Sequence, residues 1–197
     1  MISGIIMASG FSKRMQQEKL LMKIDEVPMV EAVIRSAKES RLTEVILVYR
    51  NPEVKLLADR YEVKAIYNPN AHLGQSAAIK CGIEAAAVDT KAYLFMVGDQ
   101  PFLQAEIIDK VIETYETNKP LIVVPTYKGK NTNPVLFDSS LRQSLLQIEG
   151  DQGGRGIIEA MRDRAEFIEM NDKAQLEDID SIESYLQVIK KSPNNNH

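Results

Sequence analysis

The stretch IIMASGFSKRMQQEK, residues 5–19, is the part of the sequence that decides the fold. An apolar run changes abruptly into small residues, and cations follow. The small residues are Ala8, Ser9 and Gly10, and the cations are Lys13, Arg14 and Lys19. This pattern predicts a buried strand that ends in a tight loop, where backbone N–H groups and cations face one point, as binding of a polyphosphate requires. A strand followed by a solvated basic turn would give the same pattern, so the loop alone leaves both interpretations open.

Composition and motifs exclude several classes of function. The 197 residues carry a formal net charge of -4, which argues against broad electrostatic binding of nucleic acid. No apolar run approaches the length of a membrane span, and the N-terminal segment lacks the basic region of a secretory signal. The single cysteine, Cys81, excludes an internal disulfide and fits a reducing compartment. We therefore expect a cytoplasmic protein that binds neither nucleic acid nor a membrane, and that holds anionic ligands with local cations or a metal.

Apolar runs alternate with segments of helical period along the whole chain. This alternation predicts a single three-layer α/β/α domain over residues 1–191, built on a mainly parallel, Rossmann-like sheet. Strands are expected at residues 2–7, 44–49, 64–67, 93–97, 121–125 and 166–170, with a basic turn and a short strand within 127–137. Helices are expected from Pro28 onward and at residues 53–60, 76–86, 103–115, 140–148, 157–161 and 181–190. Residues 192–197 read as a disordered tail.

Four unusual polar loops follow expected strands at their carboxyl ends. They begin after Met7, Tyr67, Val97 and Met170. In open α/β sheets, ligands bind outside the carboxyl ends of the strands, so these loops are expected to meet at one binding site.

Two acidic segments could contribute a metal site. Asp99 follows a very hydrophobic strand, where a carboxylate is costly to desolvate unless it meets a cation. Mg²⁺ takes one or two carboxylates together with phosphate oxygens, although Asp99 could equally cap the helix after Pro101. Asp178 and Asp180 could be solvated carboxylates at a helix start. If Asp180 folds back beside Asp99, the two make a divalent-metal site.

Other polar residues also have a structural and a functional interpretation. Arg155 closes a second glycine-rich loop, residues 150–155, and could grip a phosphate with both guanidinium nitrogens or pair with Asp151. Ser76 is a good N-cap for the helix that follows it. His72 lacks the spacing of a metal ligand and is expected at the surface.

The segment MASGFSKRMQQEKLL, residues 7–21, resembles the LAAGxSxRMGxxKLL signature of the molybdenum cofactor cytidylyltransferases. This family belongs to the nucleotidyltransferase superfamily, whose fold is GT-A-like. The similarity covers almost the whole chain, and further motifs follow in the family's order with compatible spacing. They are Asn68-Pro69 with Gly74 and Ser76, Asp99-Gln100-Pro101, Asn133-Pro134-Val135-Leu136-Phe137, Gly150-Asp151-Gln152-Gly153 with Arg155, and Asp178-Ile179-Asp180-Ser181.

The resemblance implies a role for each matched residue. The nucleotide would be bound by Ala8, Ser9, Gly10, Arg14, Lys19, Gly74 and Ser76. Asp99 and Asp180 would hold Mg²⁺, and the catalytic residues would be Arg14, Lys19 and Asp99. The pterin substrate would be bound by Gln100, Asn133, Gly150, Asp151 and Arg155.

The resemblance also implies an activity. Members of the family transfer CMP from CTP to the terminal phosphate of the molybdopterin-bound molybdenum cofactor and release pyrophosphate, and a molybdenum hydroxylase would receive the product. Relatives that use GTP carry Gly-Gly where the CTP users carry Ala-Gly, and Ser9-Gly10 is nearer the second. The alternatives are a GTP-using molybdenum cofactor guanylyltransferase, a cytidylyltransferase for a sugar or isoprenoid phosphate, and a non-catalytic carrier of the cofactor. Because the chain lacks both GxxxxGK[ST] and GxGxxG, we expect neither a Walker A protein nor an NAD-dependent oxidoreductase.

Overall fold

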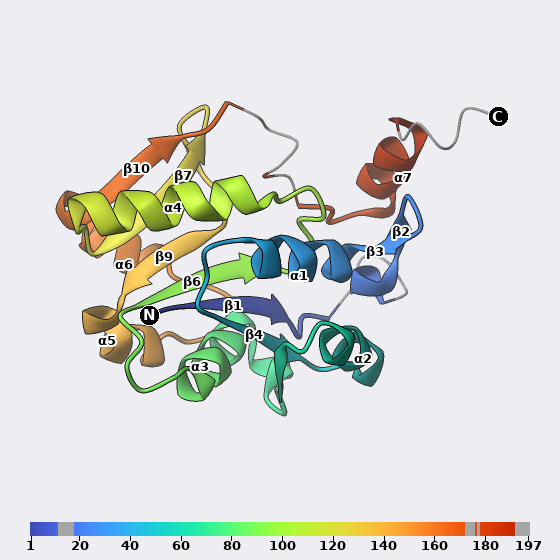
Figure 1. Ribbon diagram of the computed structural model, residues 1–197, viewed down its shortest axis with the longest axis horizontal. Coiled ribbons are helices and arrows are strands. Elements are labelled where there is room, and N and C mark those ends of the chain that lie inside the picture. The colour runs from blue at the N-terminus through green and yellow to red at the C-terminus, as the bar shows by residue number, and fades with distance from the viewer. Residues whose placement is uncertain (12–17, 172–175, 177, 192–197) are drawn as a thin grey trace.

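The computed structural model describes residues 1–11, 18–171, 176 and 178–191, and Figure 1 shows the arrangement of their elements. The expected tail at 192–197 and the candidate ligand Arg14 lie outside these residues. The strands are β1 (Ile2–Ala8), β2 (Lys23–Ile24), β3 (Val27–Pro28), β4 (Glu44–Tyr49), β5 (Lys64–Tyr67), β6 (Ala92–Val97), β7 (Ile122–Tyr127), β8 (Lys130–Asn131), β9 (Val135–Asp138) and β10 (Ala165–Glu169). The α-helices are α1 (Met29–Glu39), α2 (Pro52–Arg60), α3 (Gln75–Ala85), α4 (Ala105–Asn118), α5 (Arg142–Leu146), α6 (Arg155–Ala160) and α7 (Ile182–Lys191). Single 3₁₀ turns are η1 (Lys19–Leu21), η2 (Ala71–Leu73), η3 (Ser139–Leu141) and η4 (Arg162–Arg164).

An 8-stranded sheet forms the centre of the molecule, with the order β10-β7-β9-β6-β1-β4-β5 and β8 paired to β7. Strands β6, β1, β4 and β5 are parallel to one another, and β10 is parallel to β7. Strand β9 runs antiparallel between β6 and β7. The expectation of a mainly parallel sheet is therefore confirmed.

Two helix layers bury the two faces of the sheet. On one face, apolar residues of α1, α2 and α4 pack in a single buried cluster with Ile6 of β1 and Met96 of β6. On the other face, α3, α5 and α6 pack against Ile5 of β1 and Phe95 of β6. Successive side chains of a strand point to opposite faces, so central strands covered on both sides must be apolar throughout. This is why β6 and residues 5–8 of β1 read as apolar runs, and the expected three-layer α/β/α arrangement is confirmed.

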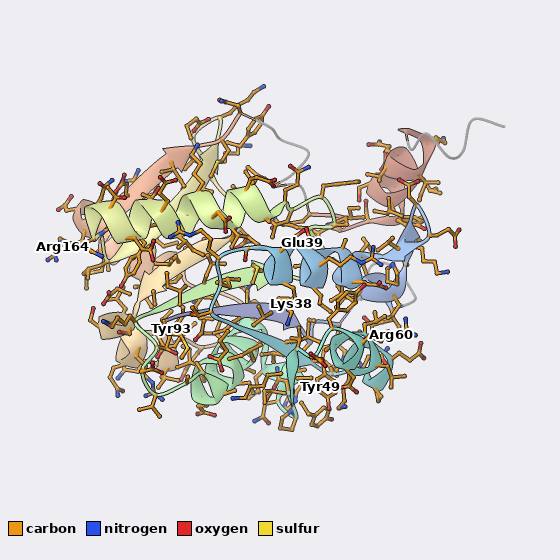
Figure 2. The ribbon with its side chains drawn as sticks, in the orientation of Figure 1. Lys38, Glu39, Tyr49, Arg60, Tyr93 and Arg164 are labelled. Carbon is orange, nitrogen blue, oxygen red and sulfur yellow. The ribbon has the colours of Figure 1, made fainter. Side chains whose placement is uncertain are left out.

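The outer surfaces of the helices carry the charged residues. Figure 2 shows Lys38 and Glu39 at the end of α1 and Arg60 at the end of α2, and all three are exposed. Among the described residues, none of the helices combines the length and the apolar character that crossing a bilayer would require.

The starts of α1, α3 and α4 differ from the expectation for reasons that the structure shows. Pro28 ends β3 and caps α1, so the helix begins one residue later than expected, at Met29. Helix α3 begins at Gln75 with Gly74 as its N-cap, so Ser76 does not cap it. Helix α4 begins at Ala105, and the expected start, Leu103, is buried in the preceding turn.

The β2–β3 hairpin gives no periodic signal in the sequence because each of its strands has only two residues. Its turn residues, Asp25 and Glu26, have positive φ angles of 48° and 67°. A two-residue hairpin turn with positive φ at both positions usually contains Asn-Gly or Asp-Gly, so Asp-Glu does not identify it. In Figure 1 this hairpin and α7 lie together at one end of the molecule, and Ile24, Met29 and Ile179 form a small separate core there.

Candidate functional site

The candidate site lies where the order of strands in the sheet reverses. From β1 the chain continues to β4 and β5 on one side, whereas β6 pairs with the opposite edge of β1. A cavity of about 600 Å³ opens at the carboxyl ends of β1 and β6. This is the place where open α/β sheets bind ligands, so the loops after these strands are the first candidates for binding groups.

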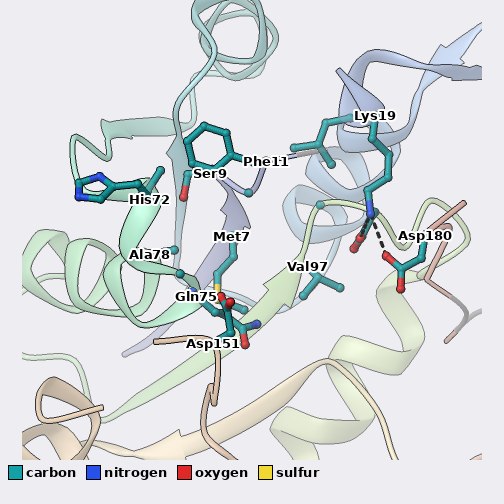
Figure 3. A pocket seen from close by; sticks show the side chains of 16 residues that line it. Met7, Ser9, Phe11, Lys19, His72, Gln75, Ala78, Val97, Asp151 and Asp180 are labelled. Carbon is teal, nitrogen blue, oxygen red and sulfur yellow. Dashed lines mark hydrogen bonds and ion pairs between the residues drawn. The ribbon is translucent and has the colours of Figure 1, made fainter. Parts of the chain in front are cut away.

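The cavity is lined by seven of the residues that the sequence singles out. They are Ser9, Gly10, Lys19, Gly74, Asp99, Asp151 and Asp180. They come from the loops after β1, β5, β6, α5 and β10, which are far apart in the sequence. Figure 3 shows Lys19 and Asp180 on one side of the cavity and His72 on the opposite side. The polar loops that were expected to meet at one edge of the sheet therefore do so.

The cationic side of the cavity centres on Lys19. Its Nζ donates to Asp99 Oδ2 at 2.5 Å and to Asp180 Oδ1 at 3.0 Å. The side chains of Lys19 and Asp99 are 14% and 18% exposed, whereas that of Asp180 is 58% exposed. Exposed ion pairs contribute little because water and salt screen them, so the Lys19–Asp99 pair is the stronger of the two. Burial alone would lower the pKa of Lys19, but the charge of Asp99 and the hydrogen bonds to Asp99 and Asp180 raise it, so the ammonium stays protonated.

Asp180 reaches the cavity because its segment docks on the loop after β6. The backbone N–H of Ile179 donates to the carbonyl oxygen of Asp99 at 3.0 Å, and the Ile179 side chain is buried. Gln100 Nε2 donates to the carbonyl oxygen of Leu176 at 2.9 Å. Gln100 is itself 1% exposed, so its role is to hold this segment and not to line the cavity.

The acidic groups at this end outnumber the cation between them. Desolvation, and then the negative charges of Asp99 and Asp180, raise the pKa of Asp178 to about 6, although part of Asp178 remains exposed to solvent. Carboxylate oxygens are the ligands that Mg²⁺ and Mn²⁺ prefer. Within the described residues no group of three or more His, Cys, Asp or Glu forms a ready-made metal site. Asp99 and Asp180 could therefore supply only two carboxylates to a divalent ion, and its other ligands would have to come from outside the described side chains.

A hydrogen bond between the loops after β1 and β5 supports the opposite side of the cavity. Asn68 Nδ2 donates to the Ser9 hydroxyl at 2.9 Å, and both side chains are buried. Asn68 Oδ1 accepts from the backbone N–H of Asn70 at 3.1 Å and from the Cys81 thiol at 3.7 Å. Burial, and then the charge of Glu84, raise the pKa of Cys81, so the thiol remains a donor. The two donors on the oxygen assign the orientation of the Asn68 amide.

The start of α3 is capped by a distant loop. The backbone N–H of Gln75 donates to Asp151 Oδ1 at 3.1 Å, and that of Ser76 donates to the carbonyl oxygen of Gly150 at 3.0 Å. Gly74 precedes them with φ 92° and ψ -167°, a conformation that L residues with a Cβ avoid. A Cβ on Gly74 would lie 2.8 Å from the carbonyl carbon of Gly150. Glycine is therefore required here for the two loops to meet.

Gly74→Ala should destabilise the protein by about 1–3 kcal/mol, the usual range for a strained backbone position. The melting temperature should fall by about 2–4 °C for each kcal/mol, measured by thermal unfolding. Gly156→Ala in α6 is the matched control, because a Cβ there meets no atom within 4 Å. Equal melting temperatures for the two variants would show that the Gly74–Gly150 contact is not constrained.

The remaining expected site residues lie elsewhere. Ala8 is buried at the end of β1, and Gly150 and Ser76, which a hydrogen bond joins, do not line the cavity. Asn133 lies between β8 and β9, where its peptide bond to Pro134 is cis, and Arg155 is the first, exposed residue of α6. Neither of these two lines the cavity.

Several lining residues were not identified from the sequence as ligands, and three of them have polar or aromatic side chains. They are Phe11, His72 and Gln75. His72 is exposed, as expected, and it also lies at the rim of the cavity. Phe11 is 47% exposed, and the signal for it would have been an aromatic residue directly after Gly10 in a polar loop.

Comparison with known proteins identifies the family. The MobA-like NTP transferase domain matches residues 4–165 of this chain. The purine catabolism protein PucB of Bacillus subtilis is 24% identical over 193 residues, covering 92% of this chain and 93% of that protein. The molybdenum cofactor cytidylyltransferase of Escherichia coli is 26% identical over 149 residues, which are 74% of each chain. The molybdenum cofactor guanylyltransferase of Rhodobacter capsulatus is 27% identical over 111 residues, which are 56% of this chain and 57% of that protein.

Solved structures share the fold at lower identity. A nucleotidyl transferase from Methanothermobacter thermautotroptrophicus superposes with a TM-score of 0.84 at 21% identity, covering 100% of this chain and 99% of that one. The manganese complex of Rv0371c from Mycobacterium tuberculosis H37Rv superposes with a TM-score of 0.81 at 16% identity, covering 96% and 98%. The sheet order and the family match lead to one conclusion: this chain belongs to the MobA-like NTP transferase domain family and is a nucleotidyltransferase.

Proposed function

We propose that this protein transfers CMP from CTP to the terminal phosphate of a molybdopterin-type cofactor and releases pyrophosphate. The observation that carries the proposal is that Ser9, Gly10, Lys19, Asp99 and Asp180 line one cavity at the switch point of the sheet. Relatives named for this reaction, such as the Escherichia coli cytidylyltransferase, support the choice of acceptor. A cytoplasmic location and a molybdenum hydroxylase as recipient of the product remain predictions.

The reaction requires positioning and neutralisation of charge more than acid–base chemistry. A phosphate oxygen of the acceptor forms a bond to the α-phosphorus of CTP. The bond from that phosphorus to the oxygen bridging to the β-phosphorus breaks, and pyrophosphate leaves with the electron pair. Because the attacking phosphate is already ionised, no strong general base is needed. Two polyanions must nevertheless approach each other on a chain of net charge -4, so the neutralising charges must be local.

The residues of the cavity divide this work between them. Lys19 would bind phosphate oxygens, and Gly10 leaves room for the triphosphate to approach the backbone at the end of β1. Asp99 and Asp180 would hold Mg²⁺, which supplies charge neutralisation on the phosphates when it is bound. Because the carboxylates belong to two separate loops, the docking of Ile179 on Asp99 determines whether they can act together.

Ser9 is our candidate for selecting the base. Among the described residues, Asn68 is the only hydrogen-bond partner of the Ser9 hydroxyl, and Asn68 is the donor in that bond. The hydroxyl proton therefore stays available for an acceptor in the cavity, and cytosine offers O2 and N3. Ser9 also fills space that a glycine, as in the GTP-using relatives, would leave open. Guanine also offers acceptors to a hydroxyl, so it is the space argument that favours the smaller base of CTP.

Variants of Ser9 separate these two arguments. Ser9→Ala keeps the Cβ and removes the hydroxyl, so KM for CTP should rise about 2- to 12-fold, the equivalent of one hydrogen bond of about 0.5–1.5 kcal/mol. Ser9→Gly removes both, so the ratio of kcat/KM for CTP to that for GTP should also fall. The measurement is pyrophosphate release with CTP, GTP and ATP in competition. A preference of the unmodified protein for GTP would overturn the cytidine proposal in favour of a guanylyltransferase.

The acceptor is tested by substrate profiling. Pyrophosphate release that depends on a molybdopterin-type acceptor is expected. Release that depends on a sugar phosphate or an isoprenoid-precursor phosphate would assign the protein to another reaction of the same fold. A stable complex with the pterin cofactor and no turnover of any nucleotide would identify a carrier.

A further inference from the structure

We propose that Arg50 is a positioning residue that holds the chain on both sides of the nucleotide-binding loop, at Phe11 and at Glu18. The inference rests on the proposed function to the extent that this loop binds the nucleotide. Arg50 directly follows β4, which is the neighbour of β1 in the sheet. It belongs to none of the motifs that the sequence analysis identified, and it does not line the cavity.

One guanidinium makes both contacts. Arg50 Cζ lies 4.6 Å from the centre of the Phe11 ring, within the range of a cation–π interaction. Arg50 Nη2 donates to Glu18 Oε2 at 2.8 Å, and Asn51 Nδ2 donates to the same oxygen at 3.3 Å. Both partners are therefore held from the end of β4.

The two partners adjoin residues of the cavity. Phe11 directly follows Gly10, and Glu18 directly precedes Lys19. A displacement of Phe11 or Glu18 is therefore passed to Gly10 or Lys19 through a single peptide unit. Arg50 thus fixes the distance between two groups that the proposed function places on the triphosphate, and small errors in such positions reduce rates strongly.

The environment of Arg50 does not look like that of a residue kept for stability alone. The side chains of Arg50 and Glu18 are 31% and 17% exposed, so their ion pair is partly shielded from water. Arg50 Nε is buried, however, and it has no hydrogen-bond partner among the described residues. An unpaired buried donor is unfavourable for folding, and such features are expected at functional positions.

Arg35 provides a matched control. It also combines a carboxylate and an aromatic ring, since it donates to Glu31 Oε1 at 2.5 Å and lies 5.8 Å from the Tyr61 ring centre. It is on α1 and does not line the nucleotide cavity. If Arg50 only stabilises the fold, Arg50→Gln and Arg35→Gln should have the same kind of effect.

The kinetic test compares Arg50→Gln, Arg50→Lys and Arg35→Gln in pyrophosphate release and in thermal unfolding. Arg50→Gln should raise KM for the nucleotide at least about tenfold, equivalent to about 1.4 kcal/mol of binding, with a smaller change in kcat. Arg50→Lys should recover part of the loss, because lysine keeps the charge without the planar guanidinium. Arg35→Gln should lower the melting temperature and leave KM unchanged. An unchanged KM in Arg50→Gln would overturn the proposal.

A second measurement needs no turnover and so separates this inference from the proposed function. The chain contains no tryptophan, so Phe11→Trp introduces a single tryptophan at the contact, and tryptophan is the best ring for a cation–π interaction. Fluorescence anisotropy of this variant should fall when Arg50→Gln is added and stay unchanged when Arg35→Gln is added. If Arg50→Gln leaves the anisotropy unchanged, Arg50 does not hold Phe11 and the inference is wrong, whatever reaction the protein catalyses. If the unmodified protein turns over no nucleotide, the proposed function fails instead.

Discussion

Asp99→Asn should lower kcat by about a hundred- to a thousandfold, the effect of removing one interaction that stabilises charge in the transition state. The carboxylate pairs with Lys19 and lies at the end of β6, beside the loop after β1. In the proposed reaction its negative charge holds the metal and nucleotide at the cavity, and a neutral amide of the same size cannot do so. The measurement is steady-state pyrophosphate release at saturating nucleotide and acceptor.

The same variant should keep the fold. The amide that replaces the carboxylate would still offer an oxygen to Lys19, which retains its contact with Asp180. Because the Lys19 and Asp99 side chains are 14% and 18% exposed, the loss of stability should exceed that of a surface pair, about 0–1 kcal/mol, and stay below that of a fully buried one, about 3–5 kcal/mol. Asp59→Asn is the control, since Asp59 pairs with Lys55 on the exposed side of α2. Full activity in Asp99→Asn would refute the role assigned to this carboxylate.

The sequence predicted the position of the site because that position follows from parallel topology. Four loops were expected to meet from strands that end at Met7, Tyr67, Val97 and Met170, and they do so because the carboxyl ends of parallel strands share one edge of the sheet. Apolar runs on both faces made the central strands recognisable. Nothing about side-chain contacts was needed for that step.

Contacts between segments far apart in the sequence could not be predicted in this way. Ser76 was expected to cap α3, but the loop at Gly150 and Asp151 caps it instead. The hydrogen-bonded residues Gln75 and Asp151 lie 76 positions apart in the sequence. Asn133 and Arg155 match family motifs, yet the structure places both outside the cavity lining. Local patterns report the preferences of one segment and carry no information on which other segment will pack against it.

The sequence identified Lys19, Asp99 and Asp180 as site residues, but it did not predict that the Lys19 ammonium contacts both carboxylates. The sequence placed Asp99 and Asp180 together as metal ligands and Lys19 separately on the triphosphate. In the structure the Lys19 ammonium lies between the two carboxylates, within hydrogen-bonding distance of each. A divalent ion that uses the same oxygens must therefore displace this ammonium, because two cations cannot share the position without strong repulsion.

Lys19→Met should consequently bind Mn²⁺ alone at least about tenfold more tightly than the unmodified protein, since one positive charge near the carboxylates is removed. Turnover should fall about a hundred- to a thousandfold in the same variant, because Lys19 is then missing from the triphosphate. These opposite effects distinguish an ammonium that competes with the metal from one that only supports the fold. Titration of free Mn²⁺ by electron paramagnetic resonance, without nucleotide, measures the first effect.

The comparison with nucleotide present completes the argument. In the unmodified protein, the triphosphate of CTP offers Lys19 new anionic partners, so the ammonium can leave the carboxylates to the metal. CTP should therefore tighten Mn²⁺ binding by a larger factor in the unmodified protein than in Lys19→Met, where only the phosphate ligands contribute. Lys23→Met is the control, because Lys23 pairs with Glu26 at an exposed position, with side chains 57% and 90% exposed, and should change neither quantity. If Lys19→Met binds Mn²⁺ no more tightly than the unmodified protein, the metal does not use the carboxylate oxygens that Lys19 contacts, and competition between the ammonium and the metal is refuted.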